Sequence, residues 1–141
     1  MERRDFLKSC VAACAVGSVL AVALQSCKTA YVATSTLENN RLKVKKSEFT
    51  DENSQARAFV VLRSSKLNFP IVVYKSNDVY TALSTECTHS SCEIQPNKVS
   101  LVCPCHGSEF SNTGKVLNPP AERDLKQYTI TTDTDYFYVQ L

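Results

Sequence analysis

Two short pairs of metal-binding side chains stand close together in the second half of the chain. The first pair is Cys87 and His89, in Cys-x-His spacing, and the second is Cys103 and His106, in Cys-x-x-His spacing. Both of the chain's histidines belong to these pairs. A spacer of 13 residues separates His89 from Cys103. This is a hairpin length, so two neighbouring loops can bring all four side chains to one metal centre.

Two kinds of metal centre accept this set of ligands. A tetrahedral zinc site of the Cys₂His₂ type uses the same side chains, but zinc modules usually open with two cysteines and close with two histidines. Here each pair holds one cysteine and one histidine. That arrangement suits a [2Fe–2S] cluster in which two thiolates hold one iron and two imidazoles hold the other. The spacing therefore favours the cluster, and a zinc-stabilised binding protein is the alternative.

The residues around the two pairs resemble a known family. The stretches Cys87-Thr-His-Ser-Ser-Cys92 and Cys103-Pro-Cys-His-Gly-Ser108 are similar to the Rieske iron–sulfur proteins, in their disulfide-bearing, high-potential branch. The resemblance extends from about residue 59 to residue 141. It implies an all-β fold, an antiparallel β-sandwich with a small cluster-binding subdomain formed by two loops. It also implies one [2Fe–2S] cluster as the cofactor.

The resemblance assigns each of the four ligands to an iron. It implies that Cys87 and Cys103 hold the inner iron and that His89 and His106 hold the outer, solvent-facing one. Because the irons of such a cluster are fully ligated, they leave no open position for a substrate, unlike a catalytic metal. The chemistry expected is one-electron transfer, at a potential of roughly −150 to +300 mV, against about −400 mV for plant-type ferredoxins.

The neighbouring residues match the family in part. The resemblance implies a disulfide between Cys92 and Cys105 that joins the two loops, and a hydrogen bond from the Ser108 hydroxyl to a cluster sulfur. High-potential members usually carry tyrosine where this chain has Phe110, and often leucine where it has Ser90. Since hydrogen bonds to the sulfurs tune the potential, the missing hydroxyl of Phe110 predicts a lower potential than in the tyrosine-bearing relatives.

The elements that must position these loops have the pattern of strands. Short runs rich in β-branched and aromatic residues, separated by turn-forming residues, are typical of an all-β domain. No long helix is indicated after residue 27. The strands are expected over residues 41–49 (at an edge), 58–62, 69–74, 79–83, 93–95, 98–102, 128–131 and 136–139. Both ligand loops are then attached to strand ends, which provide a rigid mounting.

The N-terminal segment resembles an export signal. Arg3 and Arg4 precede an apolar run of 15 residues, Cys10 to Leu24. As a helix this run spans ~22 Å, too short for a ~30 Å hydrocarbon core. The pattern is similar to a twin-arginine signal, and the end of the run to a lipobox that would leave Cys27 as a lipid-modified N-terminus. Ordinary cleavage nearby and an uncleaved membrane anchor are the alternatives. We expect a signal over 1–27, a linker or weak first strand over 28–40, and a Rieske domain over 41–141.

The composition limits the partners. Sixteen basic residues against 14 acidic ones give a net charge of +2 with no block of like charge, which argues against nucleic acid. The leading hypothesis is an electron-transfer protein tethered by lipid to a bacterial membrane on its periplasmic side. Its partner would be a cytochrome or a quinol-oxidising membrane complex, of which the chain is a plausible subunit without an open catalytic site of its own. A Rieske ferredoxin serving a soluble oxygenase is the second hypothesis.

Overall fold

A computed structural model describes residues 30–141, and almost all of the regular structure in this range is β-strand. A four-residue 3₁₀ helix, Lys46–Phe49, follows the second strand. Within residues 30–141, no helix has the length and apolar character needed to cross a bilayer. The strands are β1 (Ser35–Glu38), β2 (Arg41–Lys45), β3 (Phe59–Leu62), β4 (Ile71–Ser76), β5 (Val79–Ser84), β6 (Gln95–Pro96), β7 (Ser100–Val102), β8 (Glu109–Ser111), β9 (Val116–Asn118), β10 (Gln127–Tyr128), β11 (Ile130–Thr132) and β12 (Tyr136–Gln140).

Two of the three antiparallel sheets form a sandwich. One has the order β1-β2-β12-β11 and the other β10-β5-β4-β3. Side chains alternate between the two faces of a strand, so β2 and β12 each present every second residue to the core. Leu42 lies opposite Val139 and Val44 lies opposite Phe137, and all four are buried. The all-β sandwich predicted from the sequence is confirmed.

Strand β4 is buried on both faces, which explains its continuous apolar run. Ile71 and Val73 belong to the core between the two sandwich sheets. Val72 and Tyr74, which alternate with them, belong to a second core on the other face. A strand covered on both faces needs apolar residues at every position rather than at alternate ones. This strand therefore joins the sandwich to the part of the molecule that carries the ligand loops.

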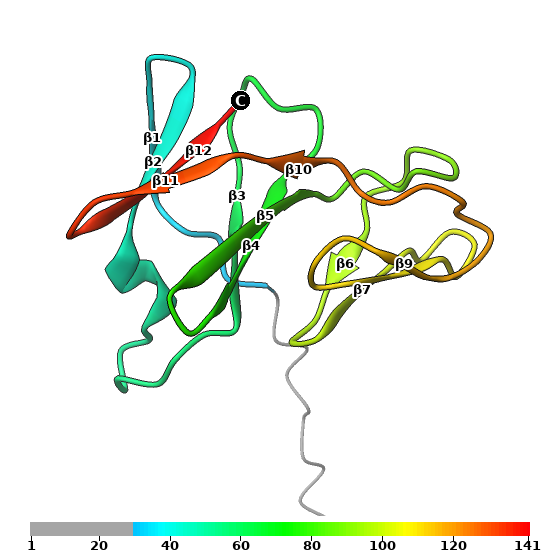
Figure 1. Ribbon diagram of the computed structural model, residues 1–141, viewed down its shortest axis with the longest axis horizontal. Coiled ribbons are helices and arrows are strands. Elements are labelled where there is room, and N and C mark those ends of the chain that lie inside the picture. Colours follow the sequence, from blue (N-terminus) through cyan, green and yellow to red (C-terminus); the bar gives the residue numbers. More distant parts are fainter. Residues whose placement is uncertain (1–29) are drawn as a thin grey trace, which may run out of the picture.

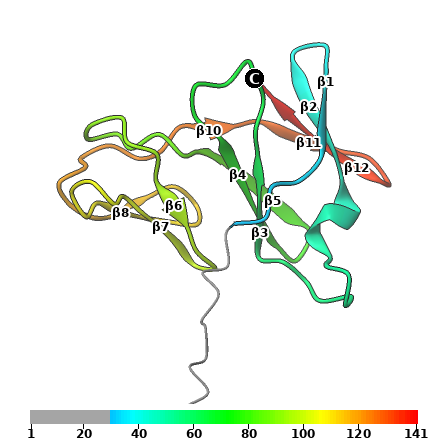
Figure 2. The ribbon, with the colours of Figure 1, turned by 180° about the vertical axis from the view of Figure 1, so that it is seen from behind.

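The third sheet, β6-β7-β8-β9, forms a small subdomain on the side of the sandwich (Figures 1 and 2). Leu101 of β7 pairs with Phe110 of β8, and both are fully buried in the second core. The hydroxyl of Tyr74 donates to the carbonyl oxygens of Asn97 and Ser100, each at 3.0 Å, and burial raises the pKa of Tyr74. These contacts fix the β6–β7 hairpin against β4, as the predicted two-loop subdomain requires.

The N-terminal part of the domain corrects one expectation. Strand β2, expected at an edge, lies between β1 and β12, so that prediction was wrong. Asn39 and Asn40 both have positive φ, 47° and 61°, which is the conformation of a tight hairpin turn whose twist matches the flanking strands. Strand β1 thus folds back onto β2 within the stretch expected to be a linker or weak first strand. The predicted signal over residues 1–27, with Cys27, lies outside the described residues.

Two strands were missed because they are very short. The segment from residue 109 to 118 reads as a turn with flanking residues, but it forms β8 and β9. Gly114 makes the turn with a φ of 86°, and a Cβ placed there would lie 2.8 Å from Cδ2 of Leu83. Glycine is therefore required both for the backbone conformation and for the close approach to β5.

Candidate metal centre

The two ligand loops have the same backbone hydrogen bonds. In the first loop, residues 87–92, Cys87 N donates to Cys92 O at 2.9 Å and Ser91 N donates to Cys87 O at 2.9 Å. In the second loop, residues 103–108, Cys103 N donates to Ser108 O at 2.8 Å and Gly107 N donates to Cys103 O at 3.0 Å. Each loop is therefore closed from its first residue to its sixth and turned at its fifth.

The fifth residue of each loop is left-handed. Ser91 has a φ of 52° and Gly107 a φ of 78°. The first loop follows β5 and the second follows β7, and these two strands belong to different sheets. The shared closure places Cys87 and Cys103, the first residue of each loop, in equivalent positions.

The two thiols form a buried pair. Cys87 and Cys103 are each 1% exposed, and neither is in a disulfide. Burial opposes ionisation of Cys87, but the backbone N–H groups of His89 and Ser90, the Cys103 thiol and the Ser108 hydroxyl all hydrogen-bond to its sulfur and lower its pKa below the usual value. The first loop thus offers a sulfur site already prepared to hold the thiolate that a metal requires.

The two imidazoles form an exposed pair. His89 and His106 are both exposed, their ring centroids are 5.0 Å apart, and their planes are nearly perpendicular at 86°. The hydroxyl of Ser90 lies 3.2 Å from Nδ1 of His106, so it bridges the first loop to the second. The predicted ligands therefore form two pairs, a buried pair of thiols and an exposed pair of imidazoles.

A disulfide joins the loops, as the family resemblance implies. Cys92 and Cys105 are bonded, with their Cα atoms 6.6 Å apart. The sulfurs of Cys92, Cys103 and Cys105 lie within 4.8 Å of one another, but two of them are spent in this bond and offer no thiolate. Their proximity shows instead that the disulfide lies directly beside the Cys103 thiol.

A proline-containing segment, residues 118–121, lies against the second loop. The buried hydroxyl of Ser108 accepts a hydrogen bond from Ala121 N at 3.0 Å while it bonds to the Cys87 sulfur. Asn118 Nδ2 donates to Gly107 O at 3.2 Å. Ser108 therefore connects three segments: the second loop, the first loop and the chain after Pro119 and Pro120.

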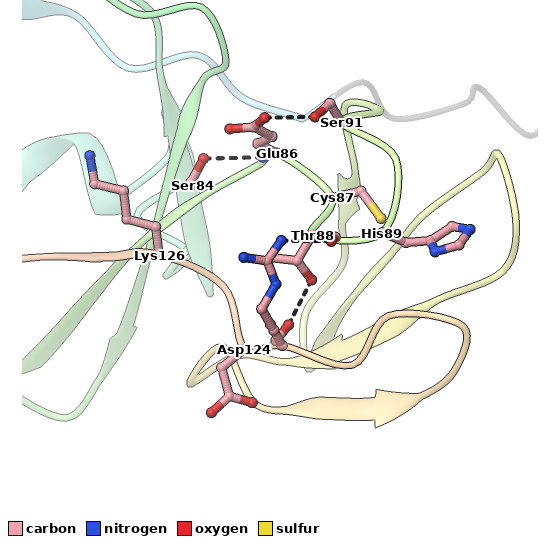
Figure 3. Close-up of a pocket in the computed structure, with 9 residues that line it drawn as sticks. Ser84, Glu86, Cys87, Thr88, His89, Ser91, Asp124 and Lys126 are labelled. Carbon is pink, nitrogen blue, oxygen red and sulfur yellow. Dashed lines mark hydrogen bonds between the residues drawn. The ribbon is translucent and has the colours of Figure 1, made fainter.

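A pocket of about 400 Å³ is lined by the first loop, including Cys87 and His89, and by residues 123, 124 and 126 (Figure 3). Thr88 Oγ1 donates to Arg123 O at 2.6 Å across it, and Ser91 Oγ donates to Glu86 at 2.9 Å. The His89 ring extends away from β5 and Lys126. Thr88 and Arg123 are 35 residues apart, so no local spacing in the sequence predicts their contact.

Comparisons with known proteins agree with this geometry. The Rieske [2Fe-2S] domain family matches residues 32–129. The chain is 31% identical to the cytochrome b6-f complex iron-sulfur subunit of Chlorobaculum thiosulfatiphilum over 140 residues, which cover 95% of this chain and 72% of the relative. The chain belongs to the Rieske [2Fe-2S] family.

Other matches cover less of this chain. The chain is 29% identical to the cytochrome b6-f complex iron-sulfur subunit of Chlorobaculum tepidum, and the match spans 50% of this chain and 40% of the relative. Among solved structures, the cyanobacterial plasma membrane Rieske protein PetC3 from Synechocystis PCC 6803 is 32% identical with a TM-score of 0.54, over 60% of this chain and 88% of that one. A complex of oxygenase and ferredoxin in carbazole 1,9a-dioxygenase, at 21% identity and a TM-score of 0.56, shows the fold alone.

Membership in the Rieske family assigns one [2Fe–2S] cluster to the chain and one-electron transfer as its chemistry. The residues present fit such a cluster. Cys87 and Cys103 are buried, whereas His89 and His106 are exposed. Two donor pairs at two depths suit two irons with different ligands.

Proposed function

We propose that this Rieske protein is an exported, membrane-tethered one-electron carrier. In this proposal Cys87 and Cys103 hold the inner iron, and His89 and His106 hold the outer one. The observation that carries the proposal is the separation of the donors into a buried thiol pair and an exposed imidazole pair. When bound, the cluster supplies reversible one-electron chemistry, and its imidazole ligands raise its potential relative to an all-thiolate cluster.

The chain's own residues then have two tasks. The buried Cys87 and Cys103, covered by Phe110 and Leu101, exclude water from the sulfur side. The exposed edges of His89 and His106 are the path by which an electron enters or leaves. Ser108 holds the sulfur side through its bond to Cys87, and the disulfide holds the two loops at a fixed separation.

The partner is proposed to be a redox complex of the cell envelope. Relatives that are named cytochrome b6-f complex iron-sulfur subunits support this, although the chain spans only 40% of the length of the Chlorobaculum tepidum subunit. A quinol-oxidising complex or another periplasmic oxidoreductase would supply the electron donor and acceptor. The twin-arginine pattern and the lipobox ending at Cys27 support export and a lipid anchor. The disulfide favours this function over that of a ferredoxin serving an oxygenase.

The test is spectroscopy of the purified holoprotein. We expect a visible spectrum and, after one-electron reduction, an EPR signal in which isotopic labelling of histidine shows two coordinating nitrogens. H89A and H106A should each lose one of these nitrogens or the whole cluster. A colourless protein that holds zinc at these four side chains would contradict the proposal. Acylation of Cys27, measured by mass spectrometry of the membrane fraction, tests the tether separately.

A further inference from the structure

Exposed apolar side chains lie at the end of the molecule opposite the ligand loops. Val79 begins β5 and is 68% exposed, and Val99 directly precedes β7 and is 72% exposed. Strand β5 leads from Val79 toward Cys87, and β7 leads from Val99 to Cys103. Each strand that delivers a ligand loop therefore has an exposed valine at its other end. Both hairpin tips lie on the lower side of the molecule in Figures 1 and 2.

The start of the described chain brings a third valine to the same face. Val32 pairs with Val61 of β3 and is 48% exposed. Because side chains alternate along a strand, Val61 and Val79 both point to the face of their sheet that is opposite the sandwich core. The β6–β7 hairpin, which carries Val99, packs on that same face through the Tyr74 hydroxyl. Val79 and Val99 are called the tether face below; Val32 lies on the same side of the sheet, at the level of Leu83.

The chain is fixed to the domain immediately after the predicted lipid site. Val61 N donates to Tyr31 O at 2.9 Å, and the Tyr31 hydroxyl donates to Glu48 at 2.8 Å. Cys27 lies four residues before Tyr31, and four extended residues span at most ~14 Å. An acyl group on Cys27 would therefore hold Tyr31, where the chain joins the domain, within about that distance of the bilayer.

We propose that the tether face rests on the surface of the membrane that holds the acyl chains. This inference rests on the lipid tether proposed above and adds the orientation of the domain. The tips carry Lys98 beside Val99 and Asp78 beside Val79, so their charges offset and the two valines are the apolar side chains that the tips present. Weak apolar contacts suffice, because the short tether gives the face a high effective concentration at the bilayer.

The orientation determines how a redox partner reaches the cluster. Strand β5 has six residues, and strands rise about 3.3 Å per residue, so the first loop lies roughly 20 Å beyond Val79. His89 and His106 then face the aqueous phase, away from the bilayer. In this orientation a redox partner reaches the cluster from the aqueous side.

The absence of tryptophan from the sequence allows a direct test. Four single variants, V79W, V99W, L37W and L117W, each give one fluorophore. Leu37 on β1 and Leu117 on β9 are matched controls, since they are also exposed, at 40% and 58%, but lie outside the tether face. The full-length lipidated holoprotein is reconstituted in phosphatidylethanolamine–phosphatidylglycerol vesicles with ordinary or brominated acyl chains. The ratio of the two emissions cancels quenching by the cluster.

We expect brominated lipid to quench V79W and V99W about twofold and the two controls by less than about a tenth. Acylated Cys27 with no quenching of V79W and V99W, or with equal quenching of L117W, would overturn the orientation and leave the tether intact. An unmodified Cys27 would overturn both. Hydrogen exchange of the unsubstituted protein tests the same orientation without any substitution. The amides of residues 76–79 and 97–99 should exchange more slowly on vesicles than in detergent micelles, and equal rates would reject the orientation.

Discussion

The first and second loops have the same backbone conformation but differ in the side-chain interactions that stabilise them. Each closes from its first to its sixth residue, with a left-handed residue at the fifth. The sixth residue is Cys92 in the first loop, where it forms the disulfide. In the second loop it is Ser108, a buried residue whose hydroxyl accepts a hydrogen bond from Ala121 N. The same hydrogen bonding therefore positions two equivalent thiols, while the other positions of each loop are free to take different roles.

The histidines are not equivalent in the two loops. His89 is the third residue of the first loop, whereas the third residue of the second loop is the disulfide partner Cys105. His106 is the fourth residue of the second loop, and its counterpart in the first is Ser90, which contacts it. The shared loop conformation thus explains the thiol pair but not the imidazole pair, which depends on how the two loops are placed against each other.

The largest expected effect is loss of the cluster when the ligand Cys103 is replaced, in contrast to replacement of the disulfide residue Cys105. C103S should abolish the [2Fe–2S] absorption and EPR signal, because the inner iron loses a thiolate. C105S, two residues away, should keep the cluster but lower the free energy of unfolding by about 3 kcal/mol, since the disulfide closes a loop of about 14 residues. Metal analysis and thermal melting measure the two effects. Full cluster occupancy in C103S would show that the loops are not equivalent in ligation.

The next effect tests the shared turn at the fifth position. G107A should lower the stability by about 1–2 kcal/mol, because alanine at a φ of 78° is strained although no atom lies within 4 Å of the added Cβ. S91A is the matched control. It keeps a side chain at a position that is already left-handed, and it loses only an exposed hydrogen bond to Glu86. If both variants melt at the same temperature as the parent protein, the left-handed turn carries no strain.

The reduction potential tests whether Ser108 and Phe110 determine the hydrogen bonding to the cluster sulfurs. S108A should lower the potential by on the order of 50–100 mV, which corresponds to a hydrogen bond of about 1–2 kcal/mol to a charged sulfur. F110Y should raise it, since a hydroxyl at this buried position would add a donor near the sulfurs. Protein-film voltammetry measures both shifts. An unchanged potential in F110Y would reject the account of Phe110 given above.

The smallest effect concerns the segment that contacts both loops, through Ala121 to Ser108 and through Arg123 to Thr88. Asp124 anchors it: hydrogen bonds from Lys115 and from Val116 N lower the pKa of its carboxyl below the usual value. A lowered pKa stabilises the folded state above the ordinary carboxyl pKa, and this contribution disappears as the pH falls through the folded value. D124N should therefore melt slightly lower than the parent protein at pH 7 and equally at about pH 2. A constant difference at all pH values would exclude the ionised carboxylate as the cause.

Much of the fold could be predicted from the sequence. The strands β3, β4, β5 and β12 are rich in β-branched and aromatic residues, and the local pattern identified each of them. Strands β8 and β9 have three residues each and are defined by the pairing of β8 with β7 and of β9 with β8, which the local sequence does not encode. The position of β2 was misjudged for a related reason, because the hairpin at Asn39 and Asn40 adds an outer strand.

The sequence by itself determined the chemistry of the centre. The donor types and their spacing lie within two six-residue loops, and a loop of that length is organised by its own hydrogen bonds. Only the tertiary structure decided the depth of each donor, the contacts of Ser108 with Ala121 and of Thr88 with Arg123, and the common face of Val32, Val79 and Val99. Those features depend on strand pairing and packing between residues far apart in the chain, and no local spacing records them.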